Sequence, residues 1–311
     1  MHLNLDPQSD LALAHRLADA ADRISLSRYQ SIDLLVETKP DATPVTDADR
    51  AIEEEIRAIL GSERPDDLII GEEFGGSELL DGIEPGRKYW VIDPIDGTKN
   101  FLRGVPTWAT LIAQGAKSVD SSSSQDAADS GHHRIDVGVV SAPALGRRWW
   151  AARGEGSYLT ENFSSASPLH TAGGIAASGI DGEALTGSTA QALTRSIAVS
   201  KVKELKDASI SYSDLIDWGG RRDSFLALLD GAWRTRALGD FLSHMLVAEG
   251  AVDFAAEPSL ALWDMAALSV IVEEAGGRFS SLEGIAGPFG RSGVSSNGLL
   301  HDDFLSRITN P

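Results

Sequence analysis

One short segment constrains the fold more than any other, because it places two carboxylates where an apolar strand ends. It reads Trp90-Val-Ile-Asp93-Pro-Ile-Asp96-Gly97-Thr98-Lys-Asn-Phe101. Asp93 and Asp96 outline a site for Mg²⁺, a cation that prefers oxygen ligands and uses few carboxylates, leaving positions for water or a substrate phosphate. Gly97 and Thr98 can present backbone N–H groups to that phosphate if a helix begins there. The alternative is an ordinary strand-to-helix turn in which the aspartates only cap.

Two further acids stand at the ends of predicted elements. Glu72 follows the predicted strand Asp67–Gly71, and Asp264 lies at the start of a predicted helix far downstream. Taken alone, Glu72 is as readily an exposed loop acid, and Asp264 as readily a helix N-cap. Because sites are usually built where elements end, their combination with the central segment favours one shared metal site.

Helical and strand patterns alternate irregularly along the chain, which favours a layered α+β architecture. Apolar residues at helical spacing predict a helix over residues 10–30, capped by Ser9, and a second helix from Thr46 onward. Short apolar runs predict strands at Asp67–Gly71, Tyr89–Asp93, Thr107–Ala113, Ile135–Val140 and Arg148–Ala152. In the second half we expect helices at Arg222–Leu229, Phe241–Glu249 and Trp263–Ala275, and strands at Val252–Ala256 and Arg278–Ser281.

The composition narrows the range of partners. With 311 residues, 42% of them hydrophobic, the chain can bury a large core. It has no cysteine, which fits a reducing cytoplasm and removes thiolate chemistry from consideration. The net charge of −19 disfavours nucleic acid and anionic lipid as partners, although an acidic surface also serves solubility. No apolar run of about 18 residues occurs, so we expect no membrane segment and a cytoplasmic location.

Several other residues are interpreted as structural. The serine-rich stretch at residues 118–133 predicts a flexible surface loop, and we expect its His132-His133 pair to be exposed and not to bind metal. His244 is interpreted as a packing histidine. Trp149 and Trp150 alternate across a predicted strand, which would leave one of them exposed or at an interface.

Over nearly its whole length the chain resembles the inositol monophosphatase superfamily of Mg²⁺-dependent, Li⁺-sensitive phosphatases. The resemblance lies in Val45-Thr-Asp-Ala-Asp49, Ile70-Gly-Glu-Glu73, the segment from Trp90 to Phe101, and Leu262-Trp-Asp264 followed by Glu274-Ala-Gly-Gly277. It implies a single phosphatase domain over residues 1–311, folded as the layered αβαβα sandwich of the inositol monophosphatase and fructose-1,6-bisphosphatase type. It also implies a homodimer, and two lobes at roughly residues 1–160 for metal and phosphate and 161–311 on the substrate side.

Carried over by position, the resemblance assigns a role to each motif residue. The metal ligands would be Glu72, Asp93, Asp96, Asp264 and the carbonyl oxygen of Ile95, with Asp49 serving a more weakly held ion. Thr98 and Asp49 would orient the attacking water, and Gly97 and Thr98 would bind phosphate through the main chain. The resemblance implies two or three Mg²⁺ ions and inhibition by Li⁺. These residue types suit the chemistry, because metals neutralise the phosphate dianion and lower the pKa of a bound water.

Within the superfamily, the C-terminal half looks most similar to histidinol-phosphate phosphatases of the actinobacterial type. The similarity lies in Trp233-Arg-Thr-Arg-Ala-Leu-Gly-Asp240, Met245-Leu-Val-Ala-Glu-Gly-Ala-Val-Asp253 and Ala256-Glu-Pro258. Histidinol phosphate carries an ammonium group and an imidazole, so its pocket needs acids beyond the metal ligands. Asp240 and Glu257 are the candidates. Glu257 could equally accept a sugar hydroxyl, and Asp240 could instead be an N-cap for a helix beginning at Phe241.

The sequence therefore predicts a Mg²⁺-dependent phosphomonoesterase that hydrolyses histidinol phosphate to histidinol and phosphate, a step of histidine biosynthesis. The alternative within the same chemistry is an inositol-1-phosphate phosphatase. Fructose 1,6-bisphosphate and nucleotide 3′-phosphates are further alternatives, but a bisphosphate would need a basic cluster, and none is evident. An alternative of another class is a non-catalytic metal-binding regulatory protein.

Overall fold

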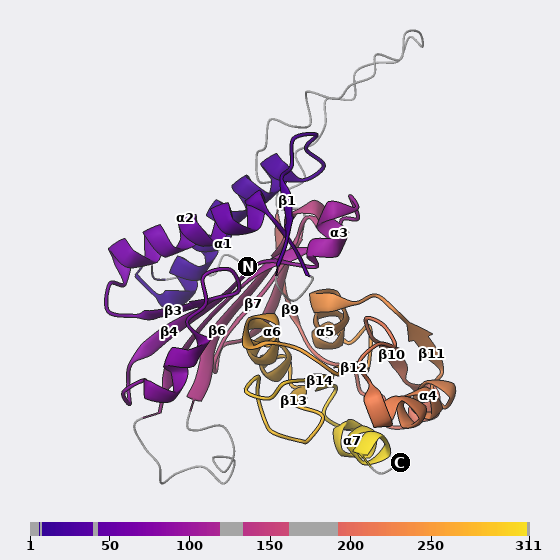
Figure 1. Ribbon diagram of the computed structural model, residues 1–311. Helices are drawn as coiled ribbons and strands as arrows, with labels where there is room; N and C mark the ends of the chain where they lie inside the picture. The colour runs from indigo at the N-terminus through magenta and orange to yellow at the C-terminus, as the bar shows by residue number, and fades with distance from the viewer. Residues whose placement is uncertain (1–5, 7, 40–42, 119–132, 162–191, 310–311) are drawn as a thin grey trace, which may run out of the picture.

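The structure is a computed structural model that describes residues 6, 8–39, 43–118, 133–161 and 192–309. Its elements stack as five layers, alternating helices and sheets (Figure 1). Helices α1 (Asp10–Arg28) and α2 (Asp47–Glu63) cover one face of a seven-stranded sheet, and α5 (Asp240–Ala248) and α6 (Leu262–Glu274) cover the other. A five-stranded sheet follows, with α4 (Arg222–Asp230) and α7 (His301–Thr309) on its far side. The αβαβα sandwich expected from the sequence is confirmed.

The other α-helices of the described residues are short: α3 (Thr98–Leu102), α4 and α7. The seven-stranded sheet has the order β3 (Leu68–Gly71), β4 (Lys88–Asp96), β5 (Ala109–Lys117), β6 (His133–Ala142), β7 (Arg147–Ala152), β8 (Gly156–Glu161) and β9 (Leu193–Ile197). The five-stranded sheet has the order β11 (Arg234–Arg236), β10 (Ser209–Ser211), β12 (Phe254–Glu257), β14 (Gly293–Ser296) and β13 (Arg278–Ser280). A hairpin of β1 (Val36–Thr38) and β2 (Pro44–Thr46) precedes α2.

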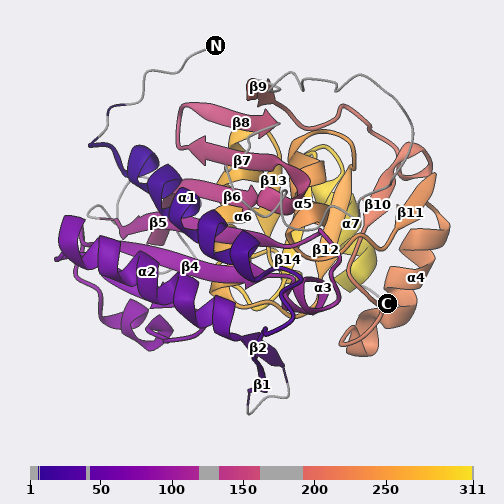
Figure 2. The ribbon, with the colours of Figure 1, turned by 90° about the horizontal axis from the view of Figure 1, so that it is seen from above.

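Strand β4 carries the central motif into the middle of the first sheet. It pairs in parallel with β3 and antiparallel with β5, so its neighbours on both sides are fixed. Figure 2 looks onto this sheet through α1 and α2. Tyr89 and Val91 face the core shared with α5 and α6, whereas Trp90 and Ile92 face the core shared with α1 and α2. Because helices cover both faces, β4 is buried as a continuous run.

The same double coverage corrects one sequence prediction. Trp149 and Trp150 do alternate across β7, but neither is exposed, with 0% and 4% of their surface accessible. Trp149 packs in the core on the α5 and α6 side, and Trp150 packs on the α1 and α2 side. The two side chains alternate across the strand as predicted, but the prediction that one is exposed was wrong. The sequence around β7 does not show this, because the helices that cover the sheet lie far away in the sequence.

Predicted helices and strands agree with the observed ones within a few residues at their ends, and Ser9 caps α1 by accepting from the Ala12 N–H at 3.2 Å. His133 departs from the loop prediction, since it begins β6 and its ring lies 5.6 Å from the Tyr89 ring. His132 and most of the 118–133 stretch lie outside the described residues. The division into two lobes near residue 160 stays a prediction, while β9 completes the first sheet beyond that point.

A close approach of α6 to the first sheet sets the position of its N-terminus. A Cβ atom at Gly138 of β6 would lie 2.6 Å from the carbonyl oxygen of Ala267, so only glycine allows this contact. The helix therefore lies directly on the sheet that carries Asp93 and Asp96. Among the described helices, none is both long and apolar enough to span a membrane.

Candidate active site

Three carboxylates from two elements meet where β4 ends and α6 begins. One oxygen each of Asp93, Asp96 and Asp264 lies within 4.8 Å of the others. The pairing of β4 with β5 shifts between Asp93 and Asp96, at Pro94, which has no N–H to donate to the ladder. Asp264 stands in the first turn of α6 and accepts from the Ala261 N–H at 2.7 Å. The N-cap of α6 is Ala261, so the interpretation of Asp264 as the N-cap is wrong; Asp264 accepts from the N-cap residue and also joins the cluster.

The electrostatics of this cluster call for a cation. Burial, followed by the negative charges of Glu72 and Asp96, raises the pKa of Asp93 well above its ordinary range. Burial also raises the pKa of Asp264 to about 7. Asp93 Oδ1 is buried and has no hydrogen-bond partner among the described residues, an arrangement that is costly unless a ligand completes it. An all-oxygen donor set with one unsatisfied carboxylate fits a hard divalent cation such as Mg²⁺.

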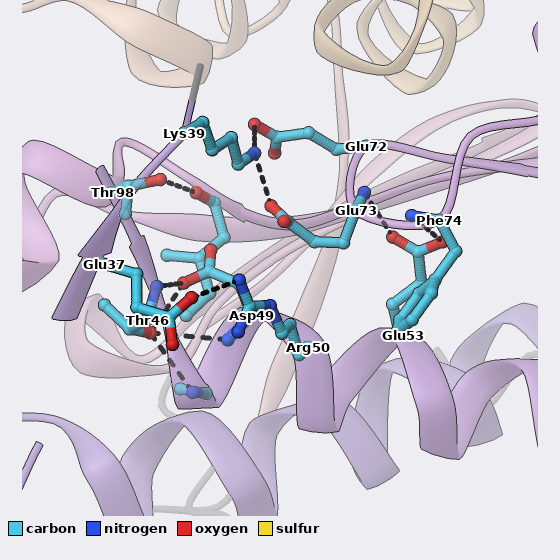
Figure 3. A network of polar contacts seen from close by, with 12 residues as sticks. Glu37, Lys39, Thr46, Asp49, Arg50, Glu53, Glu72, Glu73, Phe74 and Thr98 are labelled. Atoms are coloured by element: carbon cyan, nitrogen blue, oxygen red, sulfur yellow. Dashed lines mark hydrogen bonds and ion pairs between the residues drawn. The ribbon is translucent and has the colours of Figure 1, made fainter. Parts of the chain in front are cut away.

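Glu72 lies near this cluster but is held by an internal cation. The Lys39 ammonium donates to Glu72 at 2.8 Å and to Glu73 at 2.6 Å, as Figure 3 shows. Burial lowers the pKa of Lys39, but its hydrogen bonds to Glu72 and Glu73 outweigh that effect and raise it. Glu72 remains close enough to be the largest charge effect on Asp93. The bond from Lys39 engages Oε1 of Glu72, which leaves Oε2 as a candidate metal ligand.

Asp49 and Thr98 come from different elements and face the same region (Figure 3). Asp49 closes a capping box at the start of α2, accepting from the Thr46 N–H at 2.8 Å and the Thr46 hydroxyl at 2.6 Å. Burial raises the pKa of Asp49 to about 7, although the bonds from Thr46 oppose that shift. The Thr98 hydroxyl donates to the Ile95 carbonyl at 3.0 Å. The two side chains are brought near the cluster, each with a protein partner.

Gly97 is the N-cap of α3, so the helix expected after the aspartates does begin there. Its φ of +82° is in the left-handed region, and an added Cβ would lie 3.0 Å from the Thr107 carbonyl oxygen and 3.3 Å from Asp240 Oδ2. Asn100 bridges the same two groups, donating to Asp240 at 3.0 Å and to Thr107 at 2.9 Å. The central motif is thus joined directly to a residue of the second half of the chain.

A small pocket extends from the carboxylate cluster. It is lined by Asp96, Ser213, Asp240, Phe241, His244, Glu257, Leu260, Asp264 and Leu268. Asp240 is the first residue of α5 and not its N-cap, which is Gly239. The N-cap interpretation of Asp240 is therefore wrong. Glu257 ends β12 and accepts from the Ser213 hydroxyl, and burial raises its pKa to about 8.

The inositol monophosphatase family model matches residues 6–119 and 127–306 of this chain. The chain belongs to this family. A histidinol-phosphatase of Mycobacterium tuberculosis is 49% identical over 301 residues, 96% of this chain and 97% of that protein. A histidinol-phosphatase of Streptomyces coelicolor is 48% identical over 305 residues, 97% of this chain and 98% of that protein. The chain is thus a phosphatase, which is a hydrolase.

Solved structures of family members share the fold. An inositol monophosphatase of Thermotoga maritima superposes with a TM-score of 0.70 and 26% identity, covering 96% of each chain. One from Zymomonas mobilis gives 0.70 and 26%, covering 98% of this chain and 100% of the other. The layered α+β fold expected from the resemblance is therefore that of the family.

Some residues of this phosphatase site escaped the sequence analysis. No local sequence pattern points to Lys39 or Ser213. Each belongs to the site through a hydrogen bond to an acid more than thirty positions away. Asn100 lies inside the central motif, where its position could have drawn attention, but its bond to Asp240 spans 140 residues. Lys99 is exposed, and its charge opposes the rise in the pKa of Asp240 that burial causes.

The close contacts at Gly97 lead to a prediction. Gly97→Ala should lower the free energy of unfolding by about 1–2 kcal/mol through its positive φ, and should also reduce turnover because the new methyl group displaces the Asp240 carboxylate. Gly146 is a matched control, since it too has a positive φ, of 63°, with open space around its Cβ. Gly146→Ala should lose similar stability at unchanged turnover, as measured by thermal unfolding and phosphate release. Equal turnover in both variants would contradict the prediction.

Proposed function

We propose that this phosphatase hydrolyses L-histidinol phosphate to L-histidinol and phosphate, with Mg²⁺ held by Asp93, Asp96 and Asp264. The observation that carries the proposal is the acidity of the pocket beside the cluster. Asp240 and Glu257 add two carboxylates, and none of the described residues that line the pocket is lysine or arginine. Such a pocket suits a cationic amino alcohol and disfavours a second phosphate. The two histidinol-phosphatases described above support the same substrate.

Different residues of the chain would bind the metal and the phosphate. Mg²⁺ bound at the cluster would neutralise phosphate charge and lower the pKa of a bound water. Glu72 and the Ile95 carbonyl would complete the ligands, beside the hydrogen bonds that they accept from Lys39 and Thr98. The main-chain N–H groups of Gly97 and Thr98 would hold phosphate oxygens at the start of α3.

Asp49 would serve a more weakly held ion and, with Thr98, orient the water that attacks phosphorus. A new P–O bond forms to that water as the ester P–O bond breaks, and the departing alkoxide takes up a proton. Both hydrogen bonds from Thr46 go to Oδ2 of Asp49, which leaves Oδ1 for this role. By resemblance to the family we propose two or three Mg²⁺ ions, inhibition by Li⁺ and a homodimer. The absence of cysteine fits a cytoplasmic enzyme.

Phosphate release in the presence of Mg²⁺ tests the proposal directly. Histidinol phosphate, inositol 1-phosphate and fructose 1,6-bisphosphate are compared side by side, with and without a chelator. We expect a clear preference for histidinol phosphate and no release without Mg²⁺. Comparable rates on all three substrates would overturn the substrate assignment, and no release from any of them would favour a regulatory protein.

The role of Asp240 predicts a change in substrate preference. Asp240→Asn should lower the ratio of kcat/KM for histidinol phosphate to kcat/KM for glycerol phosphate by about ten- to hundredfold, mainly through KM, because a hydrogen bond between charged groups is worth about 1.5–3 kcal/mol. Asp214→Asn is the control, since Asp214 adds negative charge near Asp240 but does not line the pocket. An equal change of the ratio in both variants would mean that Asp240 acts only through the general field.

A further inference from the structure

His244 is a buried histidine for which the proposed reaction has no use so far. It lies in α5, with 1% of its surface accessible. Its Nδ1 lies 2.7 Å from the Ser295 hydroxyl of β14. Its Nε2 is buried and has no hydrogen-bond partner within the described part of the chain. Leaving a buried polar atom unsatisfied is unfavourable, so a ligand that completes it would bind more tightly.

A second buried histidine shows what a purely structural role looks like in this fold. His301 is as buried as His244, but both of its nitrogens are engaged. Nε2 lies 2.9 Å from the Ser280 hydroxyl and Nδ1 lies 2.8 Å from the Ser296 hydroxyl. Burial lowers the pKa of each ring to about 4, so both are neutral at physiological pH. The free Nε2 therefore distinguishes His244 from its structural counterpart.

The position of His244 associates that free nitrogen with the pocket. His244 lines the pocket together with Asp240 and Glu257. It stands four residues after Asp240 in α5, and both residues line this pocket although Asp240 has a positive φ of 49°. Ser295 holds the ring by Nδ1, so Nε2 is directed away from β14. When Nδ1–H donates to Ser295, Nε2 carries a lone pair and is an acceptor.

We propose that His244 Nε2 is a third acceptor of the pocket, which takes a hydrogen bond from an N–H group of the substrate and favours an amine- or imidazole-bearing alcohol over an alcohol that places no donor there. The inference rests on the proposed function, since it names the acceptor for that substrate. Asp240 and Glu257 supply charge for an ammonium group, whereas a neutral nitrogen suits an imidazole N–H. Apolar side chains of Phe241, Leu260 and Leu268 line the same pocket and can pack against the ring. A site built around such a bond discriminates strongly against molecules that lack it.

Two substitutions at position 244 separate the two ring nitrogens. His244→Asn places an amide near Nδ1, where Ser295 can still bond, and removes the acceptor at Nε2. His244→Gln places an amide oxygen or nitrogen near Nε2. We expect His244→Asn to lower the ratio of kcat/KM for histidinol phosphate to kcat/KM for glycerol phosphate about tenfold, mainly through KM, and His244→Gln to restore part of it. His301→Asn, as the matched control, should lower the unfolding temperature and leave the ratio unchanged.

Product binding gives a measurement that does not depend on how the Asn variant folds. In wild-type enzyme labelled with ¹⁵N-histidine, L-histidinol with phosphate and Mg²⁺ should shift the Nε2 resonance of His244, assigned through His244→Gln, and leave that of His301 in place. An unmoved Nε2 resonance, or equal losses of kcat/KM on both substrates in His244→Asn, would overturn the inference. A wild-type enzyme with no preference for histidinol phosphate would instead overturn the proposed function.

Discussion

Replacing Asp93 with asparagine is expected to lower Mg²⁺-dependent turnover about a thousandfold or more, while the metal-free protein stays folded and becomes no less stable. Loss of about 4 kcal/mol of transition-state stabilisation corresponds to that factor, and metal ions supply several kcal/mol in such reactions. Stability should behave differently, because the Asp93 carboxylate is buried among other acids and its Oδ1 has no partner in the described structure. Removing a buried charge of this kind relieves repulsion and desolvation.

The measurements are phosphate release against Mg²⁺ concentration and thermal unfolding with and without Mg²⁺. Wild type should be stabilised by Mg²⁺, by about 2.7 kcal/mol at a hundredfold excess over Kd, and Asp93→Asn should lose most of that stabilisation. Asp253 is the control, because it is equally a buried aspartate but accepts from the Ser209 N–H at 2.6 Å. Asp253→Asn should lose stability and keep the response to Mg²⁺. Full turnover in Asp93→Asn would place the metal elsewhere.

The parts of the site that can be predicted from the sequence are those that a short local pattern indicates. Asp93, Asp96 and Gly97 are consecutive features of a strand, a turn and a helix start, so local rules suffice to place them. Asp264 was found because the start of a helix is also a local signal. That these acids converge from two elements was inferred from their positions at element ends, and the structure brings three of them within 4.8 Å.

The rest depends on contacts between distant segments. The partners of Glu72 and Asp240, which are Lys39 and Asn100, lie 33 and 140 residues away from them. The exposure of Trp149 and Trp150 was predicted wrongly for a related reason, since the covering helices belong to both halves of the chain. His244 was interpreted as a packing histidine, and its Nδ1 contact fits that role. Only the three-dimensional arrangement reveals that this residue lines the pocket and that its second nitrogen has no partner among the described residues.

The acids with raised pKa values also make the stability of the metal-free protein depend on pH. Burial raises the pKa of Asp264 and Asp49 to about 7 and that of Glu257 to about 8, against about 4 in the unfolded chain. Between those values the folded state binds more protons than the unfolded state, so the free energy of unfolding falls as pH rises. The stabilisation is complete below about pH 4 and is lost as pH passes through 7 and 8.

Three buried histidines change stability in the opposite direction, mainly at lower pH. Burial lowers the pKa of His15, His244 and His301 to about 4, so each favours folding above about pH 6.5, the ordinary value, and opposes it below. Between pH 6.5 and 8.5 the histidines of the unfolded chain lose their last protons, which adds only about 0.4 kcal/mol per histidine, so the acids dominate the slope. In EDTA we expect the free energy of unfolding to fall by about 2 kcal/mol over this range, which lowers the unfolding temperature by about 5 °C.

Mg²⁺ should reverse this dependence, because the cation binds deprotonated carboxylates and its affinity therefore rises with pH. Unfolding temperatures measured in EDTA and in Mg²⁺ should lie close together at pH 6.5 and diverge steadily toward pH 8.5. In Asp93→Asn the divergence should be largely lost, whereas Asp253→Asn should retain it at a lower stability. A free energy of unfolding in EDTA that stays constant or rises with pH across this window would contradict the prediction. The charges of the clustered acids would then be neutralised by the protein itself, for instance by the Lys39 ammonium, and the site would not need a metal ion.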